Sequence, residues 1–267
     1  MTQSTSTEDT VFSPFTDIRS HFCIPEGFTS PFNNQPHPLS RLAVEKLQFY
    51  LTNQSDWHHN FGLSKENGPV IGKMFGVLVV RTEDNQVGYL SAFSGKLAGK
   101  NHHEKFVPPL FDGVAENGFL NAGMEKLSVI TEEIRKLENQ NPETNKSRIA
   151  QLKTDRKTHS ITLQNRIFDE YHFLNQAGTK KSLRQIFLSA SFKNPPAGAG
   201  ECAAPKLLQY AFQNNMQPLA IAEFWWGLSP KSATWKHGHF YPSCKEKCAP
   251  ILDHMLEGLQ MEERAEL

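Results

Sequence analysis

Three of the four cysteines lie close together near the end of the chain, and their positions predict a metal site. Cys202 opens a predicted helix, and Cys244 and Cys248 stand four residues apart at the predicted start of another. Side chains four residues apart share one helix face. A helix N-terminus favours the thiolate, which is the form of cysteine that binds metal. We therefore expect these three residues to bind zinc, with His237, His239 or water as the fourth ligand.

The alternative is that the three cysteines are small buried residues without a metal. A single C-x3-C spacing is much less specific than a pair of C-x2-C units. A predicted apolar strand from Pro218 to Trp226 separates the two helices, and it would bring the three sulfurs to one point. Cys23, in the N-terminal segment, is expected to be a buried apolar residue and not a further ligand.

Aromatic and basic residues alternate around the two histidines. Single-stranded RNA is bound by rings that stack on its bases and by cations that contact its phosphates. This pattern predicts RNA contacts from seven residues: Trp225, Trp226, Trp235, Lys231, Lys236, Phe240 and Tyr241. The alternative is that most of these rings belong to the hydrophobic core.

The composition limits the protein classes that fit this chain. Its 267 residues include 28 basic and 28 acidic side chains, so the formal net charge is zero and any RNA contact must be local. The N-terminus lacks the basic and apolar regions of a signal peptide, and no apolar run approaches the roughly 20 residues of a membrane span. We therefore expect a cytoplasmic protein without membrane contacts. In the reducing cytoplasm, the four cysteines are expected to be free thiols or metal ligands and not disulfides.

The periodicity of the apolar residues predicts an α/β fold. Residues 39–52 have the three-and-four spacing of an amphipathic helix. Residues 74–81 and 86–93 are β-branched and aromatic runs joined by turn residues, which indicates a β-hairpin with a buried first strand. With the strand at 218–226 and the Cys-bearing helices, these elements predict a small mixed sheet with flanking helices.

Two further segments would surround that core. Residues 11–38 carry five phenylalanines between five prolines, which predicts an extended arm whose rings dock on the body. Residues 124–173 are polar and charged, with an apolar stripe that Pro142 interrupts. This pattern predicts an antiparallel helical hairpin inserted into the core.

The expected organisation has five parts. They are an extended N-terminal arm (1–38), the helix and β-hairpin part of the core (39–122), the helical-hairpin insertion (123–176), the Cys-bearing part of the core (177–258) and a C-terminal tail (259–267).

Several long segments resemble the N-terminal region found on a bacterial subset of RluA-type RNA pseudouridine synthases. The segments that carry the likeness are FTSPFNNQPHPLSRLAVEKLQFYL, IGKMFGVLVVRTEDNQVGYLSAFSGKLAG, FVPPLFD, PPAGAGECAAPKLLQYAF, PLAIAEFWWGLSPKS and HGHFYPSCKEKCAPILDHML. The resemblance implies a module associated with RNA modification, whose partners are tRNA or rRNA and a separate synthase catalytic domain.

No synthase catalytic residue carries over with this resemblance. The family attacks uridine with the aspartate of an R-L-D motif, and the nearest string here, RIFDEY at residues 166–171, lies in a predicted helix. We therefore expect the module alone to be non-catalytic.

A weaker resemblance concerns the zinc-dependent nucleobase deaminases, which share the order β-hairpin, helix with a cysteine ligand, strand, and helix with two cysteines. Their general acid/base glutamate lies two residues after the first ligand, where this chain has Ala204. The second pair is C-x3-C where the family has C-x2-C. One alternative function is therefore a zinc-dependent nucleobase or nucleoside hydrolase that uses Glu201 or Glu223. A second alternative is a protein-interaction domain.

Overall fold

The computed structural model describes residues 11–16, 18, 22–112, 118–190 and 194–262. Residues 1–10 of the predicted N-terminal arm lie outside this range. The chain forms two compact units. Of the described residues, 11–16, 18, 22–110, 173–181 and 196–262 belong to the sheet unit, and 111–112, 118–172, 182–190 and 194–195 belong to the helical unit. No helix in the described ranges is both long enough and apolar enough to cross a membrane.

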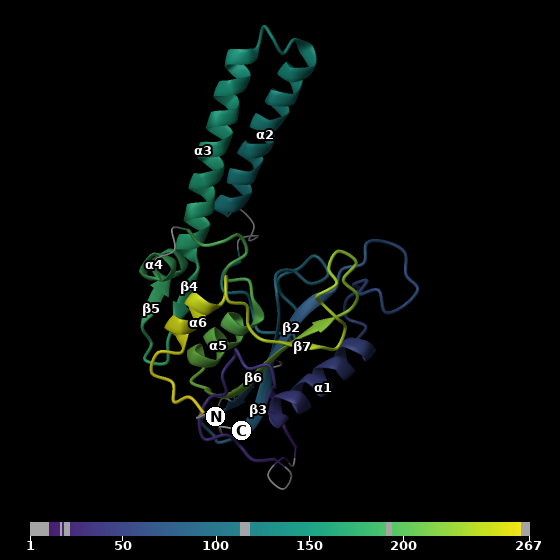
Figure 1. Cartoon of the computed structure of the whole chain (residues 1–267), viewed down its shortest axis with the longest axis vertical. Coiled ribbons are helices and arrows are strands. Elements are labelled where there is room, and N and C mark those ends of the chain that lie inside the picture. Colours follow the sequence, from purple (N-terminus) through teal and green to yellow (C-terminus); the bar gives the residue numbers. More distant parts are fainter. Residues whose placement is uncertain (1–10, 17, 19–21, 113–117, 191–193, 263–267) are drawn as a thin grey trace, which may run out of the picture. The chain divides into compact units, whose positions relative to one another are not determined.

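The sheet unit is built on five strands in the spatial order β1-β3-β2-β6-β7 (Figure 1). All four pairings between these strands are antiparallel. The α/β class predicted from the sequence is confirmed, whereas the predicted mixed pairing of the sheet is wrong. The strands are β1 (Ser13–Pro14), β2 (Lys73–Arg81), β3 (Val87–Phe93), β6 (Gln217–Trp226) and β7 (Phe240–Tyr241).

The central strand β2 is apolar because both of its faces are covered. Residues 75–80 are all buried, and β2 pairs with β3 on one side and β6 on the other. The β2–β3 turn places Asn85 at a φ of 59°, in the left-handed region that asparagine tolerates. The predicted β-hairpin and the predicted strand at 218–226 are therefore confirmed.

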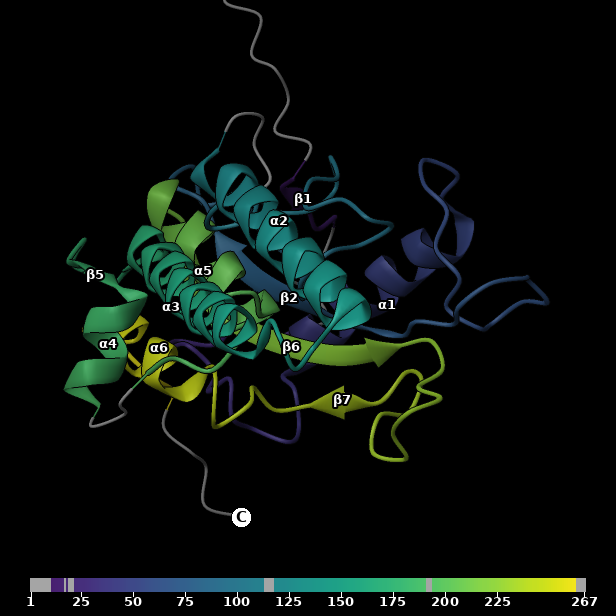
Figure 2. The same ribbon diagram turned by 90° about the horizontal axis from the view of Figure 1, so that it is seen from above.

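Helices cover both faces of this sheet (Figure 2). Helix α1 (Pro38–Asn53) packs its buried Leu39 and Leu47 into the same core as Phe75, Val77 and Val79 of β2. Side chains alternate between the faces of a strand, so Gly76 faces the opposite side. There it meets α5 (Ala203–Gln213), which packs in turn against α6 (Ala249–Met255).

The N-terminal arm contacts two strands of the sheet, β3 and β6. Its β1 strand pairs with the outer edge of β3. Further along the arm, the Thr29 backbone N–H donates to the Leu219 carbonyl of β6 at 3.1 Å. The Thr29 hydroxyl accepts from the Ile221 N–H at 3.2 Å. Phe28 is buried, which confirms the predicted docking of arm phenylalanines. Cys23 is exposed, so its predicted burial is wrong.

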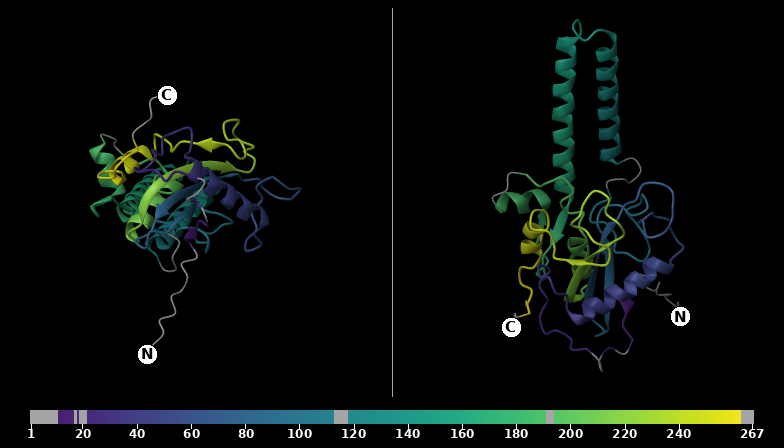
Figure 3. Two further views of the ribbon diagram at one scale, coloured as in Figure 1. Left: turned by 90° about the horizontal axis from the view of Figure 1, so that it is seen from below. Right: turned by 45° about the vertical axis from the view of Figure 1, so that its right-hand side comes forward.

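The helical unit contains the predicted antiparallel hairpin, α2 (Phe119–Gln140) and α3 (Lys146–Glu170), whose helices run side by side (Figure 3). Ile134, Ile149 and Leu152 are buried between the two helices. The short helix α4 (Leu183–Ser189) and the two-stranded sheet of β4 (His172–Leu174) and β5 (Lys180–Ser182) were not predicted. These elements are too short for a periodic signal.

Replacing residues 126–168 by a short Gly/Ser linker should leave the sheet unit folded. The hairpin has its own small core, and closing a flexible loop costs only about 0.6 kcal/mol for each doubling of its length. Thermal unfolding followed by circular dichroism should remain cooperative. Val77→Asp places a charge in the sheet core and is the positive control for loss of folding. A non-cooperative transition in the deletion variant alone would show that the sheet unit requires the hairpin.

Candidate metal centre

The three cysteine sulfurs converge in the sheet unit. One sulfur each from Cys202, Cys244 and Cys248 lies within 4.8 Å of the other two, and the Cys244 and Cys248 sulfurs are 3.3 Å apart. Among the described histidine, cysteine and acidic side chains, no other group of three comes together in this way. The predicted convergence is therefore confirmed.

The local structure at the second pair differs from the prediction. Helix α6 begins at Ala249 with Cys248 as its N-cap, so Cys244 lies in the preceding turn. The Cys244 carbonyl accepts the N–H groups of Cys248 and Ala249 at 3.2 and 3.1 Å. These bonds form one helix-like turn, which keeps both sulfurs on one side although only one cysteine belongs to the helix.

Cys202 is placed by the close approach of α5 to the sheet. It is the N-cap of α5, and the preceding carbonyl of Glu201 accepts the Gly95 N–H at 3.0 Å. Gly76 of β2 makes this approach feasible, because a Cβ atom there would lie only 2.9 Å from the Cβ of Ala203. A larger residue at position 76 would push α5, and Cys202 with it, away from the sheet.

A buried carboxyl group connects both parts of the site. Glu223 of β6 is 7% exposed and accepts a hydrogen bond of 2.6 Å from the Ser243 hydroxyl. It also accepts the backbone N–H of Ala204 in the first turn of α5, where the Cys202 side chain makes no capping bond. Burial raises the pKa of Glu223 to about 7. Glu223 thus contacts Ala204, two residues after Cys202, and Ser243, which directly precedes Cys244.

Cys244, the exposed cysteine of the cluster, is the one whose pKa favours the thiolate. Hydrogen bonds from the Cys202 and Cys248 thiols, and then from the Lys247 and Cys248 N–H groups, hold the Cys244 pKa far below its usual range. The Cys202 pKa is raised mainly because its thiol bonds to Cys244, and the Cys248 pKa is raised mainly by its bond to Cys202. Binding a metal through all three sulfurs would therefore release protons from Cys202 and Cys248.

A buried cation lies beside this anionic cluster. Lys206 is only 4% exposed, and its Nζ donates to the Phe93 carbonyl at 3.1 Å and lies 3.9 Å from the Glu201 carboxylate. Its positive charge interacts with Cys202 as well as with Glu201. Lys206 thus favours the Cys202 thiolate, and Glu201 is already engaged by a cation.

The donor set fits zinc. Thiolates bind Zn²⁺ at about 2.3 Å, which places two sulfurs of a tetrahedral site about 3.8 Å apart. The Cys244 and Cys248 sulfurs, now 3.3 Å apart, would have to separate by about 0.5 Å, whereas the other two separations lie within 4.8 Å. Neither His237 nor His239 belongs to the converging group. The His237 Nδ1 instead accepts the Gly227 N–H at 3.0 Å, and its ring contacts Trp226. Of the three predicted fourth ligands, His237, His239 and water, only water is therefore compatible with this geometry.

The predicted RNA-binding residues are divided by their burial. Trp226 is buried against Phe224, and Phe240 packs on the same core. Three half-buried rings form a group that extends to the surface: Trp235 stacks on Trp225 at 5.4 Å and meets Tyr241 edge-on at 4.6 Å.

The two cations of this set, Lys231 and Lys236, are exposed. The Tyr241 hydroxyl donates to the Thr234 carbonyl and accepts the Lys236 N–H, so the ring fixes the loop that carries the lysine. RNA binding by this group of side chains remains a prediction.

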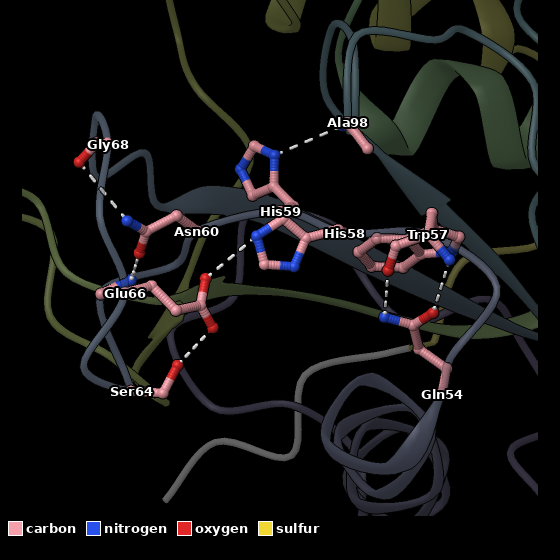
Figure 4. A network of polar contacts seen from close by, with 10 residues as sticks. Gln54, Trp57, His58, His59, Asn60, Ser64, Glu66, Gly68 and Ala98 are labelled. Atoms are coloured by element: carbon pink, nitrogen blue, oxygen red, sulfur yellow. Dashed lines mark hydrogen bonds and ion pairs between the residues drawn. The ribbon is translucent and has the colours of Figure 1, made fainter.

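The paired histidines earlier in the chain stabilise a loop (Figure 4). His58 lies 3.3 Å from the Glu66 carboxylate, and the His59 Nδ1 accepts the Ala98 N–H at 3.3 Å. The two rings have different partners, and neither belongs to the converging group of metal-ligand side chains. This loop therefore carries no second metal centre within the described residues.

Two residues of the site were not identified from the sequence. Ser243 directly precedes Cys244, and nothing in its surroundings marks it as a partner of a glutamate 20 residues earlier. Lys206 follows Cys202 by four residues, and this helical spacing is a signal that predicts a neighbouring side chain.

The raised pKa of Glu223 predicts a pH-dependent stability. The folded protein binds this proton more tightly than the unfolded chain, so the free energy of unfolding should fall as the pH rises from about 4.5 to about 7, by at most about 3 kcal/mol. Glu223→Gln cannot ionise and should lack this component. Urea unfolding of chelator-treated protein between pH 5 and pH 8 measures it, with Glu45→Gln on α1 as the control. Identical pH profiles for Glu223→Gln and the wild type would contradict this expectation.

Comparisons of the chain with known protein-family models, with curated protein sequences and with solved structures found no match. Family membership therefore contributes nothing to the description of this site. The chemistry follows from three sulfurs, one buried carboxyl group and one buried ammonium group, all placed by the sheet and its two helices.

Proposed function

We propose that this chain is a zinc-binding, RNA-associated accessory module of the RluA-type pseudouridine synthase kind, and that it is not itself a synthase. The observation that carries the proposal is the convergence of Cys202, Cys244 and Cys248 within 4.8 Å. A zinc ion there would tie the start of α5 to the segment before α6. Because such a site does not exist in the unfolded chain, the metal's binding energy would stabilise the fold.

The RNA contact in this proposal is the surface loop between β6 and β7. It offers two exposed ammonium groups, Lys231 and Lys236, and the accessible edge of the Trp235 and Tyr241 rings. Cations beside a partly exposed ring suit a single-stranded backbone with an unstacked base. The bond between the Tyr241 hydroxyl and the Lys236 backbone N–H holds the ring close to the backbone that carries the cation.

A zinc-dependent nucleobase hydrolase is the second candidate, and one observation favours it. Three protein ligands with water in the fourth position are typical of catalytic zinc, and Glu223 has a raised pKa beside them. However, the Glu223 carboxyl group already accepts hydrogen bonds from Ser243 and Ala204, which suits a structural role. Ammonia release from cytosine or adenine nucleosides, abolished by Glu223→Gln, would favour the hydrolase.

The purified protein should contain close to one equivalent of zinc, and Cys244→Ser should remove it. Loss of the ion should lower the melting temperature by about 10 °C or more, because several kcal/mol of binding energy are coupled to folding. Elemental analysis and calorimetry measure the two effects. Cys23→Ser, at an exposed cysteine outside the cluster, is the matched control and should keep both the zinc and the melting temperature. A metal-free wild type that a chelator leaves unchanged would assign the cysteines to the core.

Removing the two exposed lysines of the β6–β7 loop should weaken RNA binding and its dependence on salt. For single-stranded RNA, each phosphate contact contributes about 0.7 to the slope of log affinity against log salt, so Lys231→Ala with Lys236→Ala should reduce that slope by about 1.4. Electrophoretic mobility shifts at several salt concentrations measure it. Lys136→Ala with Lys146→Ala, which removes two exposed lysines of the hairpin, should leave the slope unchanged. Equal slopes for all three proteins would exclude this loop as the RNA contact.

A further inference from the structure

The helical hairpin has a groove of about 970 Å³ along one of its faces. Both helices contribute to it, Met124, Leu127 and Val129 from α2 and Ser160 and Ile161 from α3. The groove is separate from the buried contact between the helices, where Ile134, Ile149 and Leu152 pack. It therefore belongs to the outer surface of the hairpin and has room for several side chains of a partner.

The groove exposes aliphatic side chains that lie outside the hairpin's own core. Val129 is 62% exposed, Met124 52% and Ile161 47%. Large aliphatic side chains that gather in one groove mark a binding surface more often than a solvated face. Their positions on two adjacent helices form the kind of groove that receives the apolar side of a third helix.

The charges at the rim of the groove are predominantly positive. Arg135 lies 3.9 Å from Glu132, and the Lys153 Nζ lies 2.8 Å from Glu138, so these cations are neutralised within the hairpin. Arg156 and Lys157 also line the groove, and no ion pair within the described residues engages either of them. The groove therefore presents two unneutralised positive charges beside its aliphatic floor.

From this combination we infer that the α2–α3 groove binds an acidic amphipathic helix of a partner protein. The apolar side of that helix would cover Met124, Val129 and Ile161, and its flanking carboxylates would face Arg156 and Lys157. Opposite charges at the rim of an apolar groove set the partner's orientation and accelerate its association.

Two other occupants fit the groove less well. RNA bases stack on aromatic rings, whereas none of the described residues that line the groove is aromatic. RNA would therefore leave the aliphatic side chains of the groove uncovered. A second copy of the chain, docked groove to groove, would place Arg156 and Lys157 of one molecule opposite the same cations of the other. An acidic helix avoids both conflicts.

The test uses the full chain and a fluorescent synthetic peptide of about three heptads, with leucines along one helix face and glutamates on both flanks. Anisotropy should show saturable binding that weakens as salt rises. The double variant Arg156→Glu with Lys157→Glu should weaken binding about tenfold or more, and Val129→Ser should weaken it several-fold. Lys136→Glu with Lys146→Glu changes the net charge equally on exposed residues outside the groove and should leave affinity within about twofold.

Specificity is tested with a scrambled peptide of the same composition, with a lysine-flanked version and with single-stranded RNA. The proposal predicts weak or no binding to the first two, and RNA binding that Arg156→Glu with Lys157→Glu leaves unchanged. Equal binding of the scrambled peptide would show that the peptide binds through its charge alone, which would overturn the proposal. Absence of peptide binding, or loss of RNA binding in that double variant, would overturn it too. Circular dichroism establishes that each variant retains its helices.

Discussion

The buried carboxyl group of Glu223 is the constraint on which the arrangement of the sheet unit depends. A carboxyl group at 7% exposure must have hydrogen-bond donors, because an unsatisfied buried acceptor costs about 1–3 kcal/mol or more. The available donors are the Ser243 hydroxyl and the Ala204 N–H. Meeting this requirement fixes the first turn of α5 and the residue before Cys244 relative to β6. Together with the close approach at Gly76 and the turn at Cys244, these two contacts bring the three cysteine sulfurs together.

This arrangement also requires a position in the sheet that has no side chain. Gly76 lies directly opposite Glu223 in the β2–β6 register, and its missing side chain leaves room for Ala203 and for the Glu223 methylenes. On the other face, Phe75 and Phe224 stack in the core beneath α1. One face of the sheet is thus filled by aromatic packing, and the other is left open for a polar contact with a helix terminus. The two faces have different chemistry although the same strands form both.

The elements that the sequence predicted correctly are those with a long periodic signal. Helix α1, the β2–β3 hairpin, β6, α5 and the helical hairpin each contain enough apolar residues to show their period. The antiparallel pairing of β7, only two residues long, could not be predicted, because its register depends on tertiary contacts with β6. The convergence of the cysteines could be predicted from helix starts, whereas the Glu223–Ser243 contact could not, since it depends on how strand and loop pack.

Charge balance supports the proposal that a zinc ion held by the three cysteines would be structural. Zn²⁺ bound to three thiolates carries one net negative charge, and an ionised Glu223 beside it would add a second in a buried region. Lys206, only 4% exposed, compensates one of these charges but is shared with Glu201. With zinc bound, the remaining imbalance would favour a neutral Glu223, and a neutral carboxyl group held by Ser243 and Ala204 would not serve as a general base. The charges around the cluster therefore support the structural zinc proposal more than the hydrolase alternative.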